Sequence, residues 1–581
     1  PEADRLVAVW ESEGMRRTYQ PFTGPDYLDV RAQIRSLEEF GVTTARWANF
    51  SGGDRPQRIR GGYSSASLMD LLGVRPLHGR LFTEEEEVEG RERVVVLSYG
   101  LWQDQFGGDP GVVGSSINMD GAPREVIGIM PESFRFPTAW GGRDDTRFFA
   151  PLVIPTGPED RGMHWLGGIA RMAPDVTVEE VEAELSVIAS ELAEAYPDTN
   201  ARTHMWIQPM MARTLGGIAS TVVFLLIIVG LVLLIACGNV ASMLLARGMN
   251  RASEFAIRAS MGAGKKGLVR QLLTESFVMA LMGGAVGILI AFWGVDALKA
   301  VLPESIPRVH LIQVNLRVLG HASFITIVTG LMAGMAPALF AARTNLAETI
   351  KHGRASRGGT RSRFLSGMIV AQLAVGFVLV NSAIVLAVSY RNVMKQPTNF
   401  ATEEAVVTGL SLAGPAYDTP LKRRTFYRDL LERVRGFPGV TGAGITSKLP
   451  LRGGSNSGVM VQDQVYDPQA DFGLVEFSFA GDGYLEAMGI GLLSGRTLDL
   501  RDMEIASVMA GDSDALIELP VVINRAMAEE FWPESEALGE LVRPASAHEY
   551  FRARVVGIVE NVRQWGPDQD PLPEMYFPHT A

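Results

Sequence analysis

The sequence predicts an α-helical membrane protein in which four spans are flanked by two related extracytoplasmic domains of α/β (α+β) type. Three observations predict this fold class. Apolar residues gather between Thr214 and Tyr390 instead of spreading evenly along the chain. Basic residues gather in two of the loops that separate the apolar runs. The segments outside the runs repeat each other in the order and spacing of their short motifs.

Composition bounds the class of protein before any motif is considered. The chain has 581 residues, which exceeds one ordinary core, so several domains are expected. Its formal net charge of -12 argues against a general nucleic-acid binder. The single cysteine, Cys237, lies in an apolar run, so cysteine usage gives no information about the compartment. The chain begins with Pro1 and shows no signal peptide, so we expect a truncated or processed N-terminus.

Four uncharged runs are long enough to cross a membrane. The strongest begins at Thr214, because a bilayer core of ~30 Å needs a helix of ~20 apolar residues. The alternative for any single run is a buried helix of a large soluble protein. Allowing for the ends of the runs, we expect spans at 214–246, 274–298, 318–342 and 364–390.

The charge of the loops predicts the orientation of the spans. The segment 247–273 and the linker 343–363 carry six basic residues each, whereas the short loop 299–317 carries three. Positively charged loops stay in the cytoplasm. Both basic loops therefore face the cytoplasm, and 1–213 and 391–581 are expected outside as extracytoplasmic domains 1 and 2.

Small residues predict close packing of the second and third spans. Gly283 with Gly287, and Gly330 with Gly334, form two pairs at the four-residue spacing that lets helices approach closely in lipid. Chance in Gly-rich helices is the alternative. The centres of the spans carry no Asp, Glu, Lys or Arg, which argues against a proton- or sodium-coupled transporter.

The two outer segments share a series of motifs. DLLGVRPLHGR at 70–80 is matched by EAMGIGLLSGR at 486–496, and EVIGIM at 125–130 is matched by RVVGIV at 554–559. The FFAP that starts at Phe148 is matched by a later YFP. Because order and spacing hold over roughly eighty residues, one domain type is used twice. The repeated module covers about 66–155 in domain 1 and about 483–581 in domain 2.

The periodicity of these segments predicts short strands alternating with amphipathic helices. A helix is expected at 178–196, with Asp175 or Thr177 as its N-cap, and a counterpart at 421–434 is followed by a strand at 440–445. The acidic run Glu84–Glu87 indicates either a metal site or a solvated loop. The loop is favoured, because no His or regular carboxylate spacing accompanies the run.

No motif predicts a catalytic, metal or cofactor site. The eight His residues lack ligand spacing, and no nucleophile elbow is present. MGAGKKG at 261–267 approaches a phosphate-binding loop, but Ala259 stands where the first Gly belongs and Lys266 where Ser or Thr belongs. We therefore expect a chain without enzymatic activity, in which this segment is part of a basic cytoplasmic loop.

That loop carries a family resemblance. CGNVASMLLARGMNRASEFAIRASMGAGKKGLVRQLLTESFVMALMGG, from Cys237, resembles the signature of MacB/FtsX-type ABC transporter permeases, the mechanotransmitting ABC systems. The resemblance implies a short cytoplasmic coupling helix that contacts an ATPase. The residues that match its contact surface are Arg251, Glu254, Arg258, Gly262 and Ala263. Positive-inside anchoring is the alternative for the basic residues, but it does not require Glu254.

The outer segments resemble the MacB-like periplasmic core domain. The resemblance rests on FGGDPGVVGSSINMDG from Phe106, VIGIMPESFRFP from Val126 and FYRDLLERVRGFPGVTGAGITSKLPLRG from Phe426. The internal duplication is similar to that of the duplicated orphan permeases of acidobacteria, which repeat the order span, core domain, three spans. This subgroup implies an intact protein with eight spans, one before Pro1 and three after Ala581, in the bacterial inner membrane.

The resemblance implies an export or mechanotransmitting permease that couples ATP hydrolysis by a separate ABC ATPase to motions of its periplasmic domains. ATP would be held by that partner, and this chain would need no cofactor. Membrane lipids are further partners, and a periplasmic adaptor or outer-membrane partner is left open. Two alternatives are an ATPase-independent scaffold or sensor, and an efflux channel with a substrate path between the spans. The sequence does not indicate the substrate.

Overall fold

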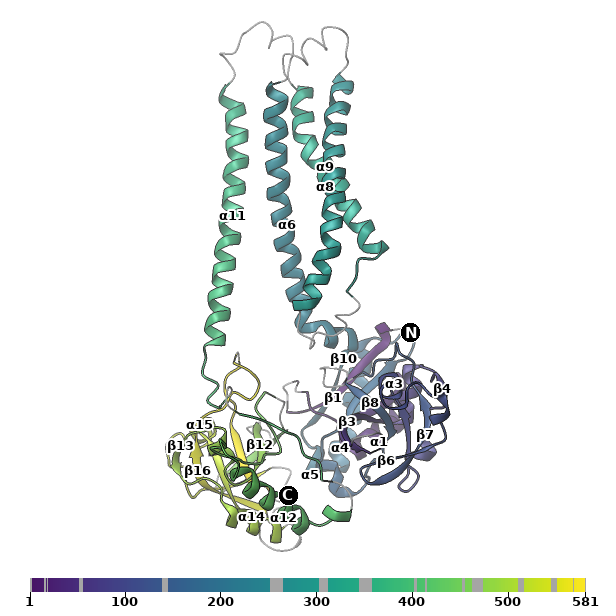
Figure 1. Cartoon of the computed structure of the whole chain (residues 1–581), viewed down its shortest axis with the longest axis vertical. Coiled ribbons are helices and arrows are strands. Elements are labelled where there is room, and N and C mark those ends of the chain that lie inside the picture. Colours follow the sequence, from purple (N-terminus) through teal and green to yellow (C-terminus); the bar gives the residue numbers. More distant parts are fainter. Residues whose placement is uncertain are drawn as a thin grey trace. The chain divides into compact units, whose positions relative to one another are not determined.

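The structure is a computed structural model, shown in Figure 1. It describes residues 3–14, 17, 19–51, 56–137, 145–250, 265–301, 312–343, 358–401, 405–412, 415–451, 455–461, 474–509, 517–544, 551–567 and 569–579. The chain divides into two compact units, one formed by Pro1–Thr214 with Asn392–Ala581 and one formed by Leu215–Arg391. The first unit contains two separate sheets, which define domain 1 and domain 2.

Domain 1 is built on a ten-stranded sheet in the order β10-β1-β9-β2-β3-β8-β5-β7-β4, and β6 pairs with β2 and β7. Its strands are β1 (Leu6–Glu13), β2 (Leu37–Phe50), β3 (Gln57–Ser64), β4 (His78–Gly79), β5 (Val94–Leu97), β6 (Ser116–Met119), β7 (Ala122–Ile129), β8 (Thr146–Pro151), β9 (Gly167–Met172) and β10 (Thr203–Pro209). Its helices are α1 (Gly24–Gln33), α2 (Ala66–Leu72), α3 (Tyr99–Phe106), α4 (Val178–Ala195) and α5 (Pro197–Asn200).

Helix α4 shows how the sequence fixes an element of domain 1. Thr177 is its N-cap, and the Thr177 hydroxyl and the Glu180 carboxylate form a reciprocal capping box. Val181, Leu185 and Ile188 recur at helical spacing and are buried against β1, β2, β9, β10 and α1. Each buried aliphatic side chain of this kind stabilises the fold by about 1.5–3 kcal/mol. The expected helix and one of its two expected caps are confirmed.

Domain 2 is built on a seven-stranded sheet in the order β13-β16-β14-β17-β12-β11-β15, with a further pairing of β15 and β16. Its strands are β11 (Ser455–Val461), β12 (Leu474–Ala480), β13 (Leu492–Gly495), β14 (Ile517–Asn524), β15 (Leu541–Pro544), β16 (Phe551–Val559) and β17 (Glu574–Pro578). Its helices are α12 (Pro420–Arg435), α13 (Tyr484–Ala487), α14 (Leu500–Met509) and α15 (Arg525–Phe531).

Strands β11–β17 repeat the pairing of β2–β8 strand for strand. The parallel pairs are β3–β8 and β5–β7 in domain 1, and β12–β17 and β14–β16 in domain 2. The antiparallel pairs also correspond. For example, β2–β3 of domain 1 corresponds to β11–β12 of domain 2, and β6–β7 corresponds to β15–β16. The two sheets thus share one topology over these strands, while β1, β9 and β10 add a further edge to domain 1.

The glycines of the repeated motif mark a shared irregularity. Gly79 and Gly495 have φ of +74° and +78°, a left-handed conformation that favours glycine. A Cβ on Gly79 would meet the carbonyl oxygen of Ile127, and a Cβ on Gly495 would meet that of Val556. In each domain the bulge between the two parallel strands falls at this point. The close approach explains why both sequence motifs keep the glycine.

The structure tests two further expectations, the strand at 440–445 and the acidic run Glu84–Glu87. The segment 440–445 is not a strand: Thr446 alone forms a bridge there, to Ala480, and β11 takes the place next to β12. The acidic run, expected as a loop, forms a short 3-10 helix at Glu84–Glu86, in which Glu84 pairs with Arg31 at 2.6 Å and Glu86 with Arg80 at 2.7 Å. No group of three or more metal-ligating side chains forms within the described ranges.

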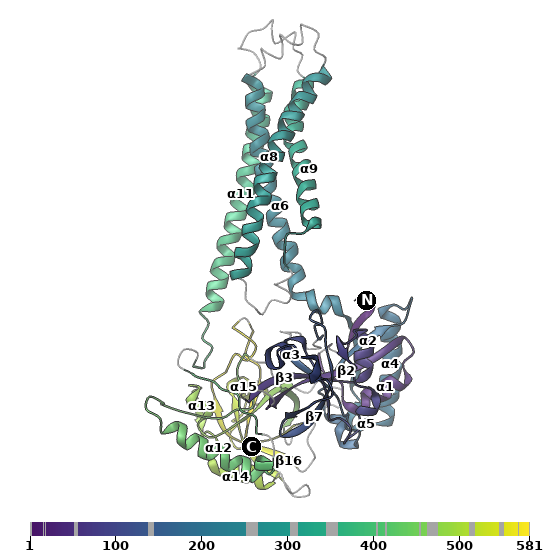
Figure 2. The same ribbon diagram turned by 45° about the vertical axis from the view of Figure 1, so that its right-hand side comes forward.

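The second unit consists of long helices, which run alongside one another in both Figure 1 and Figure 2. They are α6 (Met210–Asn250), α8 (Lys265–Val301), α9 (Leu316–Arg343) and α11 (Gly358–Met394). Among the residues that the structure describes, four stretches are long and apolar enough to cross a membrane: Val222–Leu244, Val269–Ala300, Leu316–Met335 and Ile369–Met394. The four spans expected from the sequence are confirmed as helices, and each helix extends beyond its apolar run.

Candidate functional site

The residues expected to contact an ATPase lie outside the described part of the chain. Arg251, Glu254, Arg258, Gly262 and Ala263 all fall within 251–264, and their role stays a prediction. The structure describes both flanks of this segment. Helix α6 ends at Asn250 and helix α8 begins at Lys265, so the segment connects two membrane helices at the ends where both were expected to leave the membrane.

The first turns of α8 satisfy their own polar groups. Gln271 Nε2 donates to Glu275 Oε1 at 3.2 Å, and Ser276 Oγ donates to the carbonyl oxygen of Leu272 at 2.9 Å. Both pairs have the i, i+4 spacing that brings side chains together on one helix face. Ser276 is 5% exposed and faces α9. Back-bonding of this kind makes a hydroxyl compatible with an apolar helix interface.

Helices α8 and α9 meet along a seam of small residues, which we call the α8–α9 seam. It pairs Ser276 with Gly334, Ala280 with Gly330 and Gly284 with Thr326. A Cβ on Gly334 would lie 2.8 Å from Ser276 Cβ, one on Gly330 2.5 Å from Ala280 Cβ, and one on Gly284 2.6 Å from Thr326 Cγ2. The helices therefore approach more closely than larger side chains would allow.

The seam refines the expected packing glycines. Gly330 and Gly334 lie in it, but Gly283 and Gly287 do not, since no described atom comes within 4 Å of a Cβ built on either. On α8 the packing glycine is Gly284, one position along from Gly283. One residue rotates a side chain by about 100° around a helix, which is enough to move it off the contact face. The spacing of Ser276, Ala280 and Gly284 at four-residue intervals is the signal that would have found it.

A second close approach links α6 and α11. A Cβ on Gly238 would collide with the side-chain amide of Gln372, so the glycine makes room for a polar side chain of the neighbouring span. Gln372 lies between apolar residues of α11. A polar side chain in an apolar helix favours contact with a partner helix over contact with lipid. This contact was not predicted from the sequence.

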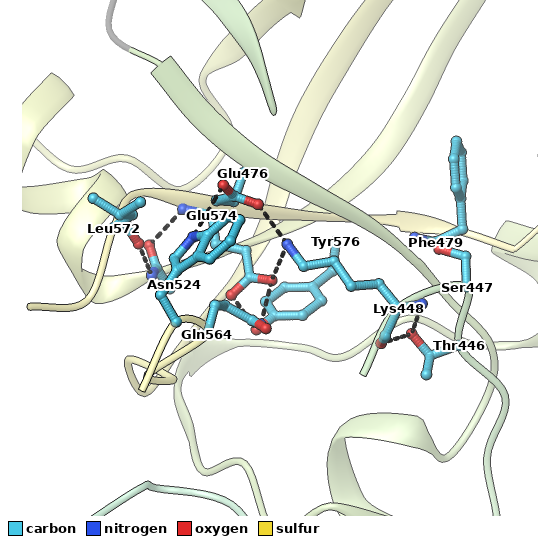
Figure 3. Close-up of polar contacts among 11 residues, drawn as sticks. Thr446, Ser447, Lys448, Glu476, Phe479, Asn524, Gln564, Leu572, Glu574 and Tyr576 are labelled. Atoms are coloured by element: carbon cyan, nitrogen blue, oxygen red, sulfur yellow. Dashed lines mark hydrogen bonds and ion pairs between the residues drawn. The ribbon is translucent and has the colours of Figure 1, made fainter. Parts of the chain in front are cut away.

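Domain 2 encloses a buried polar centre, shown in Figure 3. Lys448 Nζ donates to Glu476 Oε2 at 2.6 Å and lies 3.8 Å from Glu574 Oε1. Glu476 is 2% exposed and Glu574 1% exposed. One cation is thus buried against two carboxylates. Lys448 lies on the loop before β11, Glu476 on β12 and Glu574 on the neighbouring strand β17.

Neutral side chains donate further hydrogen bonds to the two carboxylates. Gln564 Nε2 donates to Glu574 Oε1 at 2.7 Å, and Tyr576 Oη donates to Glu574 Oε2 at 2.8 Å. Trp565 Nε1 donates to Glu476 Oε1 at 3.3 Å. Burial raises the pKa of Glu574 despite the opposing charge of Lys448. Burial also raises the pKa of the Tyr576 hydroxyl, which therefore remains a donor.

The polar centre distinguishes domain 2 from domain 1. The register of the shared strands places Arg147 of domain 1 where domain 2 has Glu574, because Val96 pairs with Phe149 as Val522 pairs with Tyr576. Arg147 forms a surface pair with Asp104 at 2.6 Å. The topology is shared, but the charge at this position is reversed. Sequence reasoning missed the centre, since no motif joins residues that lie so far apart along the chain.

Comparison with protein families supplies two matches. Residues 1–188 match the MacB-like periplasmic core domain, and residues 226–346 match the FtsX-like permease C-terminal region. The first covers most of domain 1, and the second covers most of α6, all of α8 and α9, and the expected coupling segment between α6 and α8.

Curated relatives include MacB proteins of two bacteria. The macrolide export ATP-binding/permease protein MacB of Escherichia coli K12 is 27% identical over 281 residues, which are 48% of this chain and 41% of that protein. The MacB protein of Salmonella paratyphi A is 25% identical over 339 residues, or 55% of this chain and 50% of that protein. The chain thus spans about two fifths to a half of the length of the relatives it matches.

Solved structures with similar parts include the periplasmic region of MacB from Actinobacillus actinomycetemcomitans, at 16% identity and a TM-score of 0.28, covering 36% of this chain and 91% of that one. The extracellular domain of the noncanonic ABC-type transporter YknZ from Gram-positive bacteria is 13% identical with a TM-score of 0.26, covering 34% and 98%. The family assignment rests on the sequence matches and the membrane helices. With a MacB-like periplasmic core domain followed by an FtsX-like permease region, the chain belongs to the MacB/FtsX-like ABC permeases.

Proposed function

We propose that this chain is the membrane part of an ABC-type mechanotransmitting or export system, and that a separate ATPase drives it from the cytoplasmic side of a bacterial inner membrane. The observation that carries the proposal is the joining, in one chain, of a MacB-like core domain and an FtsX-like permease region. Both matched regions belong to the permease class and neither is a nucleotide-binding domain, whereas the MacB relatives are named ATP-binding/permease proteins. ATP would be bound and hydrolysed by the partner.

The segment 247–270 is the proposed contact with that ATPase. It is basic, it connects α6 to α8, and Glu254 adds a charge that membrane anchoring does not require. ATP-driven movement of this segment would tilt α6 and α8, and the α8–α9 seam would carry the movement to α9. Domain 1 follows directly, because Pro209, the last residue of β10, is followed by Met210, the first of α6.

Domain 2 is proposed as a second copy of the core domain. The support is the shared pairing of β2–β8 and β11–β17, together with the matched glycines Gly79 and Gly495. The reversed charge at Glu574 and Arg147 indicates that the copies have diverged in their interiors. A periplasmic adaptor or outer-membrane protein is a further proposed partner of these outer domains.

Co-purification tests the coupling proposal. The full chain carrying Glu254→Arg with Arg258→Glu is expected to lose an ABC ATPase that co-purifies with the unaltered chain from the native membrane. The matched control is Glu529→Arg with Arg525→Glu, a charge exchange in domain 2 away from the basic loops. Retention of the ATPase by the Glu254 and Arg258 variant would contradict the proposed contact.

A membrane-anchored scaffold or sensor without an ATPase is the second candidate. The polar centre of domain 2 supports it, because no step of the proposed coupling uses these buried charged groups. If no ATPase co-purifies with the unaltered full chain from its native membrane, this candidate replaces the first.

A further inference from the structure

Domain 1 holds a second buried charged cluster, formed by Glu11 on β1, Asp26 on α1 and His164 in the loop before β9, and named here the Glu11 triad. Glu11 is 0% exposed and Asp26 1% exposed. The triad belongs to neither the coupling segment nor the α8–α9 seam. Ionisable groups in such positions need partners, because burial disfavours their charged forms.

His164 connects two chain segments to β1. Its Nδ1 lies 2.8 Å from Glu11 Oε2 and 3.0 Å from the carbonyl oxygen of Pro21. Both of these oxygens accept hydrogen bonds, so Nδ1 carries the hydrogen. Backbone bonds accompany the contact: Glu11 exchanges two with Gln20, and Phe22 exchanges two with Leu166.

Asp26 supplies the remaining negative charge of the triad. It forms an ion pair with Arg161 and accepts from Asn200 Nδ2 at 3.0 Å. Arg161 also pairs with Asp29 at 2.8 Å, and its guanidinium lies 3.6 Å from the centre of the Tyr196 ring. Asp26 and Asp29 thus share one arginine, and Glu11 adds a third acid next to Asp26. A proton on Glu11 or His164 therefore lowers the cost of burying the cluster.

The pKa values of Glu11 and His164 are both raised, as expected for a cluster with more acids than cations. Burial raises the pKa of Glu11 to about 7, against the opposing effect of His164. Burial lowers the pKa of His164, but the hydrogen bond and charge of Glu11 outweigh it, and the pKa is raised overall. Asp26 acts in the same direction on both groups. The triad therefore exchanges a proton near neutral pH.

We propose that the Glu11 triad is a proton-operated latch of domain 1. Protonated, it holds the segments 20–22 and 164–166 against β1. On losing the proton it leaves a buried excess of negative charge, and these segments open more often. Glu11 pairs in register with Met205 of β10, and the end of β10 is followed directly by the membrane helix α6. The latch therefore lies beside the strand that connects domain 1 to α6. This regulation goes beyond the proposed function and does not depend on an ATPase.

The sign of the pH effect follows from linkage. A carboxyl whose pKa is raised from 4.5 to about 7 stabilises the closed state fully below pH 4.5, and this stabilisation is lost as the pH rises through 7. The raised pKa of His164 acts with the same sign. Mild acid should therefore close the latch and alkali should loosen it. From pH 6 to pH 8 the Glu11 contribution changes the opening equilibrium on the order of tenfold.

Hydrogen exchange followed by mass spectrometry tests the latch in the full chain in lipid nanodiscs. After correction for intrinsic exchange rates, peptides covering 6–27 and 157–172 should be roughly tenfold more protected at pH 6 than at pH 8. Glu11→Gln keeps an oxygen to accept from His164 but removes the proton, and it should abolish most of this difference. Peptide 122–130, on β7 of the same domain, should show no difference.

Glu191→Gln, on an exposed position of α4, is the matched control and should keep the full pH dependence of the unaltered chain. If Glu11→Gln disrupts the fold, seen as lost protection of β7, Glu11→Met replaces it, because it also removes the titrating carboxyl, and the same reduced pH dependence is expected. Equal corrected protection at both pH values in the unaltered chain overturns the latch. So does a folded Glu11→Gln chain that retains the full difference.

Discussion

At the scale of single residues, the polar centre of domain 2 depends on Lys448. Its ammonium group is the cation that Glu476 and Glu574 share, at 2.6 Å and 3.8 Å. A buried ion pair stabilises little compared with a well-packed apolar substitute, but removing one partner leaves uncompensated charge in the interior. Two carboxylates facing each other across β12 and β17 would then repel.

Lys448→Met should destabilise domain 2 by about 3–5 kcal/mol, because it keeps the bulk of the side chain and removes the charge. Hydrogen exchange of β12 and β17 in the full chain measures the loss. The destabilisation should shrink in acid, where protonated carboxyls need no cation, and adding Glu476→Gln should recover part of it. Lys422→Met, which removes an exposed pair with Asp418, should leave the stability of domain 2 almost unchanged. Equal effects of the two substitutions would count against a buried centre.

At this scale the sequence predicts contacts between residues that are close along the chain, but not contacts between distant residues. Thr177 could be predicted as a cap because the Glu180 that completes its box lies three residues away. Glu11 and His164, or Lys448 and Glu574, are more than a hundred residues apart, and their pairing depends on strand register. Nothing in the pattern of β1 distinguishes a buried glutamate from a solvent-facing one.

At the scale of elements, the α8–α9 seam shows how packing selects among similar residues. Gly283, Gly284 and Gly287 all lie on α8, yet only Gly284 meets a described residue of α9. The four-residue spacing of Ser276, Ala280 and Gly284 faces Gly334, Gly330 and Thr326 in antiparallel order. The sequence predicts the existence of the helices well, because length and hydropathy suffice, although each helix extends beyond its apolar run. It predicts their contact faces poorly, because both candidate faces of α8 are small and apolar.

Gly334→Leu should separate α8 from α9, because a Cβ there already lies within 2.8 Å of Ser276. Overpacking of this kind costs roughly 1–3 kcal/mol. The midpoint of thermal denaturation of the full chain in detergent should fall. Gly287→Leu is the matched control, since it gives the same gain in helix propensity on a face that no described residue covers, and its midpoint should stay near that of the unaltered chain. A larger loss in Gly287→Leu than in Gly334→Leu would place the contact on the other face.

At the scale of the whole molecule, the four spans found among the described residues predict that both outer domains lie on the same side of the membrane. Four helices long and apolar enough to cross a membrane stand between domain 1 and domain 2. An even number of crossings returns the chain to the side on which it began. The six basic residues each of 247–273 and 343–363 predict that the loop between spans one and two and the loop between spans three and four lie in the cytoplasm. The strand pairing that the two domains share is consistent with both working in one compartment.

Cysteine labelling in spheroplasts tests this orientation in a chain whose own cysteine is removed by Cys237→Ala. Glu191→Cys in domain 1 and Glu529→Cys in domain 2 are exposed positions and should react with a membrane-impermeant maleimide in intact spheroplasts. Ser253→Cys in the basic loop should react after permeabilisation alone. Labelling of one outer domain without the other would require an odd number of crossings. Labelling of Ser253→Cys in intact spheroplasts, with both domains protected, would invert the orientation and remove the coupling segment from the reach of any cytoplasmic ATPase.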